Sequence, residues 1–158
     1  MKNKIHLTTF CLIIAALWVS TGKAQTSPVA LPAVLNNYPW TDSELIEPAA
    51  LAASIKANTA TLPLIINIGA VEDIKGAKHI GAASKSENLK ALKSMVATLP
   101  KNTGIVIYCG CCPFPKCPNI RPAFQELKKM GFTNVKLLNL PVNLQTNWIG
   151  KGYPLAGS

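Results

Sequence analysis

The sequence is poor in acidic residues and in histidine. Seven Asp and Glu stand against 16 Lys and Arg, and there are two histidines, His6 and His79. A basic surplus can favour nucleic acid or anionic lipid, but here the lysines are scattered and no aromatic residues alternate with them. We therefore expect no nucleic-acid partner. Motifs for binding a nucleotide or a flavin are also absent, so we predict no cofactor.

The sequence has no internal repeats, and its N-terminal apolar run is too short to anchor it in a membrane. This run, Leu7 to Val19, has 13 residues, whereas a spanning helix needs about 20. Lys2 and Lys4 precede the run and the small residues of Gly22-Lys23-Ala24 follow it, which is the order of a cleaved secretory signal. We expect residues 1–24 to be this signal. The protein would then be periplasmic or secreted, with no stable membrane anchor after cleavage.

The rest of the chain divides into a lead-in and one domain. Residues 25–43 contain three prolines and no sustained hydrophobic period, which indicates a loosely ordered lead-in. From Glu44 to Ser158 the pattern is regular, and this length suits a single domain.

Buried strands and amphipathic helices alternate within this domain. A nearly continuous apolar run at 64–68 and a continuous one at 105–108 predict buried strands, and a third strand is expected at 135–140. Pro48 suits the first turn of one helix, Ser86 the N-cap of a second, and Gly131 the end of a third. The predicted fold is therefore α/β, a single domain with a mainly parallel central sheet flanked by helices.

Four cysteines gather in one loop of this domain. They are Cys109, Cys111, Cys112 and Cys117. Cys109 directly follows the apolar run Ile105 to Tyr108, and open α/β sheets bind ligands at the carboxyl ends of their strands. The loop therefore occupies the place where such folds carry their sites.

The helix after the loop is expected to begin with Asn119 as its N-cap. Pro122 then falls at the third helical position, where its missing N–H costs nothing. The free N–H groups of this helix would face the loop and suit an anion. We expect a thiolate there to have its pKa lowered by the helix dipole and by the charges of Lys116 and Arg121.

Several segments together resemble the rhodanese-like domains. The likeness runs from about Glu44 to Pro154 and includes the strand before Cys109, a helix ending in Gly131-Phe132, and the segment Lys78-His79-Ile80-Gly81-Ala82. Trp148 and Gly152-Tyr153-Pro154 resemble the family's C-terminal landmarks.

The resemblance implies a sulfurtransferase that carries a sulfane sulfur as a persulfide on Cys109. The sulfur would come from a small anionic donor, thiosulfate or a persulfide, and pass to a thiophilic acceptor such as a thiol. The substrate-binding loop would comprise Gly110, Cys111, Cys112, Lys116, Cys117 and Arg121. The sequence leaves the identity of any protein partner open.

The chain departs from the family pattern in three places. Its cysteine loop is several residues longer than the usual six and carries three additional cysteines. Asn67-Ile68-Gly69 stands where relatives often have Asp-x-Arg, and Leu140-Pro141 replaces a glycine pair. These departures affect the expected activity more than the expected fold.

Other interpretations of the same residues remain open. In an oxidising compartment the cysteines can form disulfides. Alternatively, Cys109, Cys111, Cys112 and Cys117 can bind Cu(I) or Zn(II) as a metal carrier, or the domain can keep the fold and act only in binding. Outside the loop we expect structural roles, with His79 satisfied in a turn and with Tyr108, Trp148 and Tyr153 packed in the core.

Overall fold

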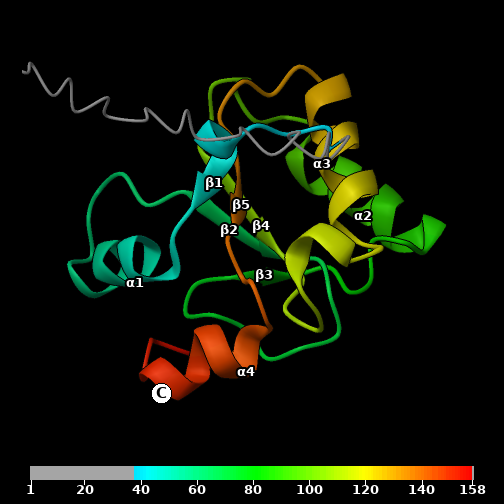
Figure 1. Ribbon diagram of the computed structural model, residues 1–158. Helices are drawn as coiled ribbons and strands as arrows, with labels where there is room; N and C mark the ends of the chain where they lie inside the picture. The colour runs from blue at the N-terminus through cyan, green and yellow to red at the C-terminus, as the bar shows by residue number, and fades with distance from the viewer. Residues whose placement is uncertain (1–37, 158) are drawn as a thin grey trace, which may run out of the picture. The chain divides into compact units, whose positions relative to one another are not determined.

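The computed structural model describes residues 38–157, which form one five-stranded sheet between helices (Figure 1). The strands are β1 (Leu45–Ile46), β2 (Leu64–Asn67), β3 (Lys78–His79), β4 (Ile105–Tyr108) and β5 (Val135–Leu138). Every strand pair is parallel, and the spatial order is β1-β5-β4-β2-β3. The predicted α/β class with a mainly parallel sheet is confirmed, and β4 is its central strand.

Four α-helices and three short 3-10 helices accompany these strands within residues 38–157. The α-helices are α1 (Pro48–Lys56), α2 (Ser86–Val96), α3 (Ile120–Lys129) and α4 (Leu144–Asn147). The 3-10 helices are η1 (Asp42–Glu44), η2 (Phe114–Lys116) and η3 (Ile149–Lys151). As predicted, Pro48 occupies the first turn of α1 and Gly131 follows α3 with a φ of 87°.

Three predicted boundaries are wrong by one or two residues. Strand β2 ends at Asn67 and not at residue 68. Ser86 is the first residue of α2 and not its N-cap, because the first helical bond runs from the Leu89 N–H to the Lys85 carbonyl. Strand β5 ends at Leu138 and not at Leu140. Pro141 has no N–H to continue a ladder, and the chain turns there.

Alternating strand residues divide the core into two halves, as expected for a sheet covered on both faces. The half shared with α1 and α4 contains Ile65, Val106 and Tyr108, packed with Leu51 and Trp148. The half shared with α2 and α3 contains Ile66, Ile105 and Ile107, packed with Leu92 and Phe124. The predicted core positions of Tyr108 and Trp148 are confirmed, since both are fully buried.

Part of the predicted lead-in is packed on the domain. Trp40 is 9% exposed, and its ring lies 5.0 Å from Tyr38, 6.0 Å from Phe114 and 5.9 Å from Phe124 between centroids. The loose order expected for the lead-in is therefore wrong for its described end, residues 38–43, because an aromatic cluster holds it. The rest of the lead-in and the predicted signal, residues 1–24, lie outside the described residues.

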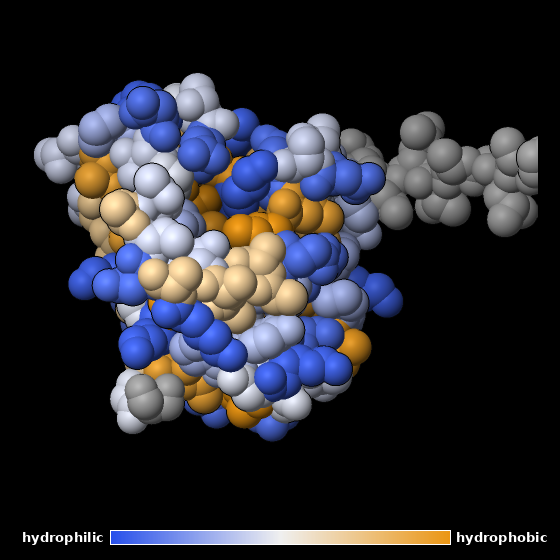
Figure 2. All heavy atoms as spheres, turned by 90° about the vertical axis from the view of Figure 1, so that its left-hand side faces the viewer, coloured by the Kyte–Doolittle hydropathy of each residue, from blue (hydrophilic) through white to orange (hydrophobic). Residues whose placement is uncertain are grey.

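The surface has a mixed character on the face shown in Figure 2. Hydrophilic and apolar residues are interspersed there, and hydrophilic residues border a hollow with an apolar floor. Leu62 and Val142 are the large hydrophobic side chains exposed within residues 38–157. In the same range, no helix combines the length and the apolar character needed to cross a membrane.

Candidate active site

The cysteine loop begins at the carboxyl end of the central strand. Cys109 directly follows β4, and its residue is 1% exposed. Because β2 and β5 pair with β4 on either side, the backbone of Cys109 extends from the most constrained part of the sheet. The position predicted for the nucleophile is therefore a fixed one.

The loop that follows Cys109 is attached to the domain at two points. The Gly110 carbonyl accepts a hydrogen bond from the Leu144 N–H at 2.8 Å, and a Cβ on Gly110 would lie 2.8 Å from the Leu144 Cβ. Further along, the Phe114 N–H donates to the Leu140 carbonyl, and the Phe114 ring is buried beside Trp40. A buried aromatic residue thus holds the additional length of this loop against the core.

Three cysteine sulfurs form a compact cluster. The Sγ atoms of Cys109, Cys111 and Cys117 all lie within 4.8 Å of one another. The Cys109 and Cys111 sulfurs are 3.2 Å apart, and Cys112 lies 3.4 Å from Cys111. Cys109 and Cys117 are buried, whereas Cys111 is exposed. All four cysteines of this loop are free thiols in the structure.

Asn119 is a site residue that the sequence indicated only as a helix cap. Helix α3 begins at Ile120, as predicted, but the Asn119 side chain makes no cap hydrogen bond. Its Nδ2 donates to the Cys109 Sγ at 3.1 Å, and its Oδ1 accepts from the Ser84 N–H at 2.9 Å. The buried amide therefore links the cysteine to the segment before α2.

Hydrogen-bond donors around Cys109 favour its thiolate. The Cys117 thiol, the Asn119 amide and the backbone N–H and thiol of Cys111 lower the pKa of Cys109 to about 5, against the effect of burial. In return, the hydrogen bond to Cys109 raises the pKa of Cys117, and burial together with Cys109 raises that of Cys111 to about 12. One thiolate with two protonated thiol neighbours is the expected state at neutral pH.

Hydrogen bonds, and not the charges of Lys116 and Arg121, are the largest causes of this lowered pKa. Both side chains are exposed, and the Arg121 guanidinium lies 5.8 Å from the centre of the Trp40 ring. Neutral and backbone donors beside a buried sulfur act at closer range than exposed, solvated charges.

Gly69 packs directly against Cys109. A Cβ at this position would lie 2.4 Å from the Cys109 carbonyl oxygen and 2.9 Å from its Sγ. The chain can therefore carry no side chain here without moving Cys109. This contact explains why glycine occupies position 69, and no local sequence pattern indicates it.

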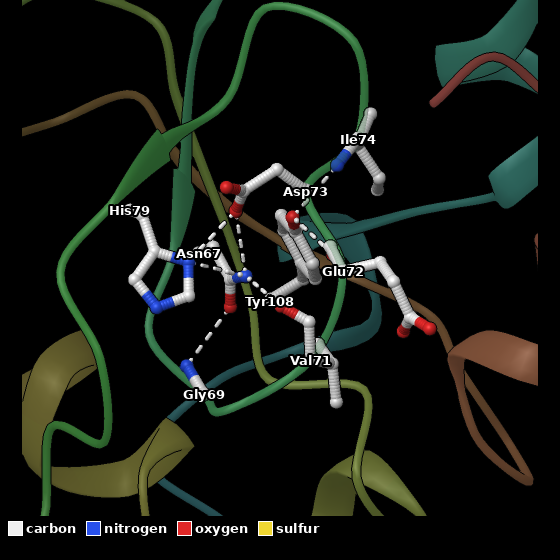
Figure 3. A network of polar contacts seen from close by, with 8 residues as sticks. All are labelled: Asn67, Gly69, Val71, Glu72, Asp73, Ile74, His79 and Tyr108. Carbon is white, nitrogen blue, oxygen red and sulfur yellow. Dashed lines mark hydrogen bonds and ion pairs between the residues drawn. The ribbon is translucent and has the colours of Figure 1, made fainter. Parts of the chain in front are cut away.

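A polar network holds the segment that follows Gly69 (Figure 3). The buried Asn67 amide donates to the Val71 carbonyl and to Asp73 Oδ1, both at 2.8 Å, and its Oδ1 accepts from the Gly69 N–H at 3.0 Å. Asp73 also contacts the His79 Nδ1 at 2.9 Å. The structural role expected for His79 agrees with this contact.

The buried Tyr108 hydroxyl completes the support of the same segment (Figure 3). It accepts from the Ile74 N–H at 2.9 Å and donates to the Glu72 carbonyl at 3.2 Å. Side chains from β2, β3 and β4 thus fix the turn that carries Gly69 against Cys109.

Comparison with known proteins identifies the fold. No family model matches the chain, and no curated protein matches it either. The rhodanese-like domain of the Alr3790 protein from Anabaena sp. is similar in structure, with 18% identity, a TM-score of 0.51, and coverage of 73% of this chain and 80% of that one. A crystal structure of Alr3790 gives 18% identity and a TM-score of 0.50, covering 71% and 91%.

A second solved protein contains a similar domain. A persulfide form of EanB, in a tetrahedral intermediate state with ergothioneine, has 20% identity and a TM-score of 0.51. The similarity covers 70% of this chain and 27% of EanB, so the chain spans about a quarter of that protein. These comparisons show that residues of this chain form a rhodanese-like fold, as the sequence predicted.

Proposed function

We propose that this protein is a sulfurtransferase in which Cys109 carries a sulfane sulfur. The observation that carries the proposal is the set of hydrogen-bond donors around a buried thiolate at the end of β4. A thiolate is the form of cysteine that attacks sulfur. The fold supports the same role, because a persulfide form is known for EanB, which contains a similar domain.

The first half-reaction needs only the Cys109 thiolate and a donor with a sulfane sulfur. With thiosulfate, the Cys109 Sγ attacks the outer sulfur, a new S–S bond forms, and the old one breaks as sulfite leaves with the electron pair. In the second half-reaction, the acceptor attacks the outer sulfur and the Cys109 thiolate leaves. A thiol of low pKa is a good leaving group, so the hydrogen bonds to Cys109 assist this second step.

The loop supplies the contacts that we propose for the anionic donor. Lys116 and Arg121 are exposed and provide positive charge, and Gly110 allows the backbone to approach closely. Cys111 is the exposed member of the sulfur cluster. Since Cys109 is 1% exposed, we expect the Cys111 side chain to move aside when the donor binds.

A single-turnover assay with thiosulfate tests this proposal. Reduced wild-type protein is expected to release one equivalent of sulfite and to take up one sulfane sulfur, which is detected as thiocyanate when cyanide is present during loading. Cys109→Ser should do neither, because a hydroxyl is a poor nucleophile at neutral pH. Wild-type protein that loads no sulfur from thiosulfate or from a small persulfide would instead be a rhodanese-fold binding domain.

A second candidate function is the binding of one soft metal ion. Three thiols within 4.8 Å of one another match the trigonal or tetrahedral sulfur sets that Cu(I) and Zn(II) accept. Of the four ligands that the sequence offered, Cys112 falls outside this cluster. Titration with Cu(I) or Zn(II) should then lose its tight site in Cys109→Ser, Cys111→Ser and Cys117→Ser and keep it in Cys112→Ser. Weak binding in all variants would reject this candidate.

We also propose that the protein acts outside the cytoplasm. The support is the order of charged, apolar and small residues at 1–24. Free thiols in such a compartment require a reductant, which bears on how the sulfur cluster turns over.

A further inference from the structure

The sulfur atoms of Cys109 and Cys111 lie as close to each other as two atoms that are about to react. Their sulfurs are 3.2 Å apart, within the range of about 3–3.5 Å found for near-attack pairs. Gly110 between them has a φ of 77°, a conformation that glycine adopts without strain. This left-handed glycine folds the chain back so that two cysteines separated by one residue face each other.

Neither other cysteine is placed as well for reaction with a sulfur on Cys109. Cys117 is 4% exposed, and its thiol donates a hydrogen bond to the Cys109 thiolate. Its side chain is therefore buried and has little room to move toward a new bond. The Cys112 sulfur contacts Cys111 at 3.4 Å and does not belong to the three-sulfur cluster. Cys111 combines proximity to Cys109 with exposure, and an exposed side chain can adjust its position.

The geometry also selects which sulfur of a persulfide Cys111 attacks. In the persulfide, the outer sulfur lies about 2 Å beyond the Cys109 Sγ. The Cys109 Sγ itself stays within reach of Cys111, and an S–S bond there needs the two sulfurs to approach by about 1.2 Å. Attack on the outer sulfur would need Cys111 to move away from its present position, so the inner sulfur is the nearer target.

Given the sulfurtransferase proposed above, we propose that Cys111 resolves the Cys109 persulfide by forming a Cys109–Cys111 disulfide and releasing the transferred sulfur as sulfide. The Cys111 sulfur bonds to the Cys109 Sγ, and the bond to the outer sulfur breaks. The Cys111 thiol proton passes to the outer sulfur of the persulfide anion, so that Cys111 attacks as the thiolate and the outer sulfur leaves with that electron pair as hydrosulfide, HS−. The sulfane sulfur is reduced, the two cysteines are oxidised, and no other oxidant takes part.

The proposal defines the class of the acceptor. A resolved site holds a disulfide, so a second turnover requires an external dithiol that reduces it by thiol–disulfide exchange. The external thiol is expected to attack the Cys111 sulfur of this disulfide, because Cys111 is exposed and Cys109 is buried. Cys109 then leaves as the thiolate that its neighbours stabilise.

The test is a single turnover with thiosulfate, followed by intact mass and by assays of sulfite and sulfide. No external thiol is present. Wild-type protein should release one equivalent each of sulfite and sulfide and lose the mass of two hydrogen atoms. Cys111→Ser should release sulfite only and gain the mass of one sulfur atom. Cys112→Ser is the matched cysteine control and should form the same disulfide as wild type, whatever its loading rate.

The outcomes separate this inference from the proposed function. If wild-type protein releases no sulfite, sulfur transfer itself is rejected. If wild type releases sulfite and keeps a stable added sulfur, transfer stands and resolution by Cys111 is rejected. Disulfide formation that persists in Cys111→Ser and is lost in Cys117→Ser or Cys112→Ser would also reject it, because the resolving thiol would be another cysteine.

Discussion

Replacing Asn119 by alanine should raise the pKa of Cys109 by an amount set by one hydrogen bond. The Asn119 amide donates to the Cys109 sulfur at 3.1 Å in a buried position. A hydrogen bond to a charged group contributes about 1.5–3 kcal/mol, and each pH unit corresponds to about 1.4 kcal/mol. From a pKa of about 5, the expected value in Asn119→Ala is therefore roughly 6–7.

The assay is the pH dependence of Cys109 alkylation by iodoacetamide, followed at the Cys109 peptide by mass spectrometry. The thiolate reacts, so the rate rises through the pKa of Cys109 and is lost as the pH falls below it. Wild type should show its midpoint near pH 5, and Asn119→Ala should need a higher pH to reach the same fraction reacted.

Two further variants separate the hydrogen bond from other effects. Asn119→Asp keeps an acceptor for the Ser84 N–H but replaces the donor by a carboxylate, so its midpoint should rise at least as far as that of alanine. Lys116→Gln should leave the midpoint where it is, because the Lys116 charge is not a cause of the low pKa. Equal midpoints in wild type and Asn119→Ala, or a rise in Lys116→Gln alone, would refute this account of the thiolate.

Three other predictions follow from the structure and the sequence. Gly69→Ala should lose about 1–3 kcal/mol of stability in urea unfolding and slow sulfur loading, because its Cβ would overlap Cys109; wild-type values for both would contradict the close contact. Tyr108→Phe should lose about 1–3 kcal/mol by leaving the Ile74 N–H without its acceptor, and unchanged unfolding would show that water replaces the hydroxyl. N-terminal sequencing of the native protein should begin at Gln25, and an uncleaved cytoplasmic chain would reject export.

The sequence predicted the strands and helices that have a strong hydrophobic pattern. Strand β4 is a continuous apolar run and β2 is apolar up to Asn67, and α3 has an apolar face and a glycine after its end. The two-residue strands β1 and β3 were not predicted as strands, because such short segments carry no period and depend on their neighbours for pairing.

The candidate site was predicted in part. The place of Cys109 followed from the strand before it, since ligand sites lie at the carboxyl ends of parallel strands. The roles of Asn119 and Gly69 depend on contacts between segments far apart in the chain, namely the bond to Ser84 and the approach to Cys109. No local pattern encodes these contacts. The packing of Trp40 on Phe114 was missed for the same reason, because a proline-rich segment gives no periodic signal.

The three-sulfur cluster separates two roles that a run of cysteines does not distinguish. Cys117 holds the Cys109 thiolate from the buried side, whereas Cys111 covers it from the exposed side. A substitution at Cys117 is therefore expected to act most strongly on the pKa of Cys109, and under the proposed function one at Cys111 is expected to act mainly on the fate of the transferred sulfur.

The most direct test of the central claim is to locate the transferred sulfur within the loop. Reduced wild-type protein is loaded with thiosulfate, the thiols and persulfides are trapped at once by alkylation, and the peptide containing residues 109–117 is sequenced by tandem mass spectrometry. The account predicts the additional sulfur on Cys109, or a Cys109–Cys111 disulfide where resolution has already occurred. Sulfur found first on Cys112 or Cys117 with Cys109 still a free thiol, or an unmodified loop after exposure to both thiosulfate and a small persulfide, would contradict it.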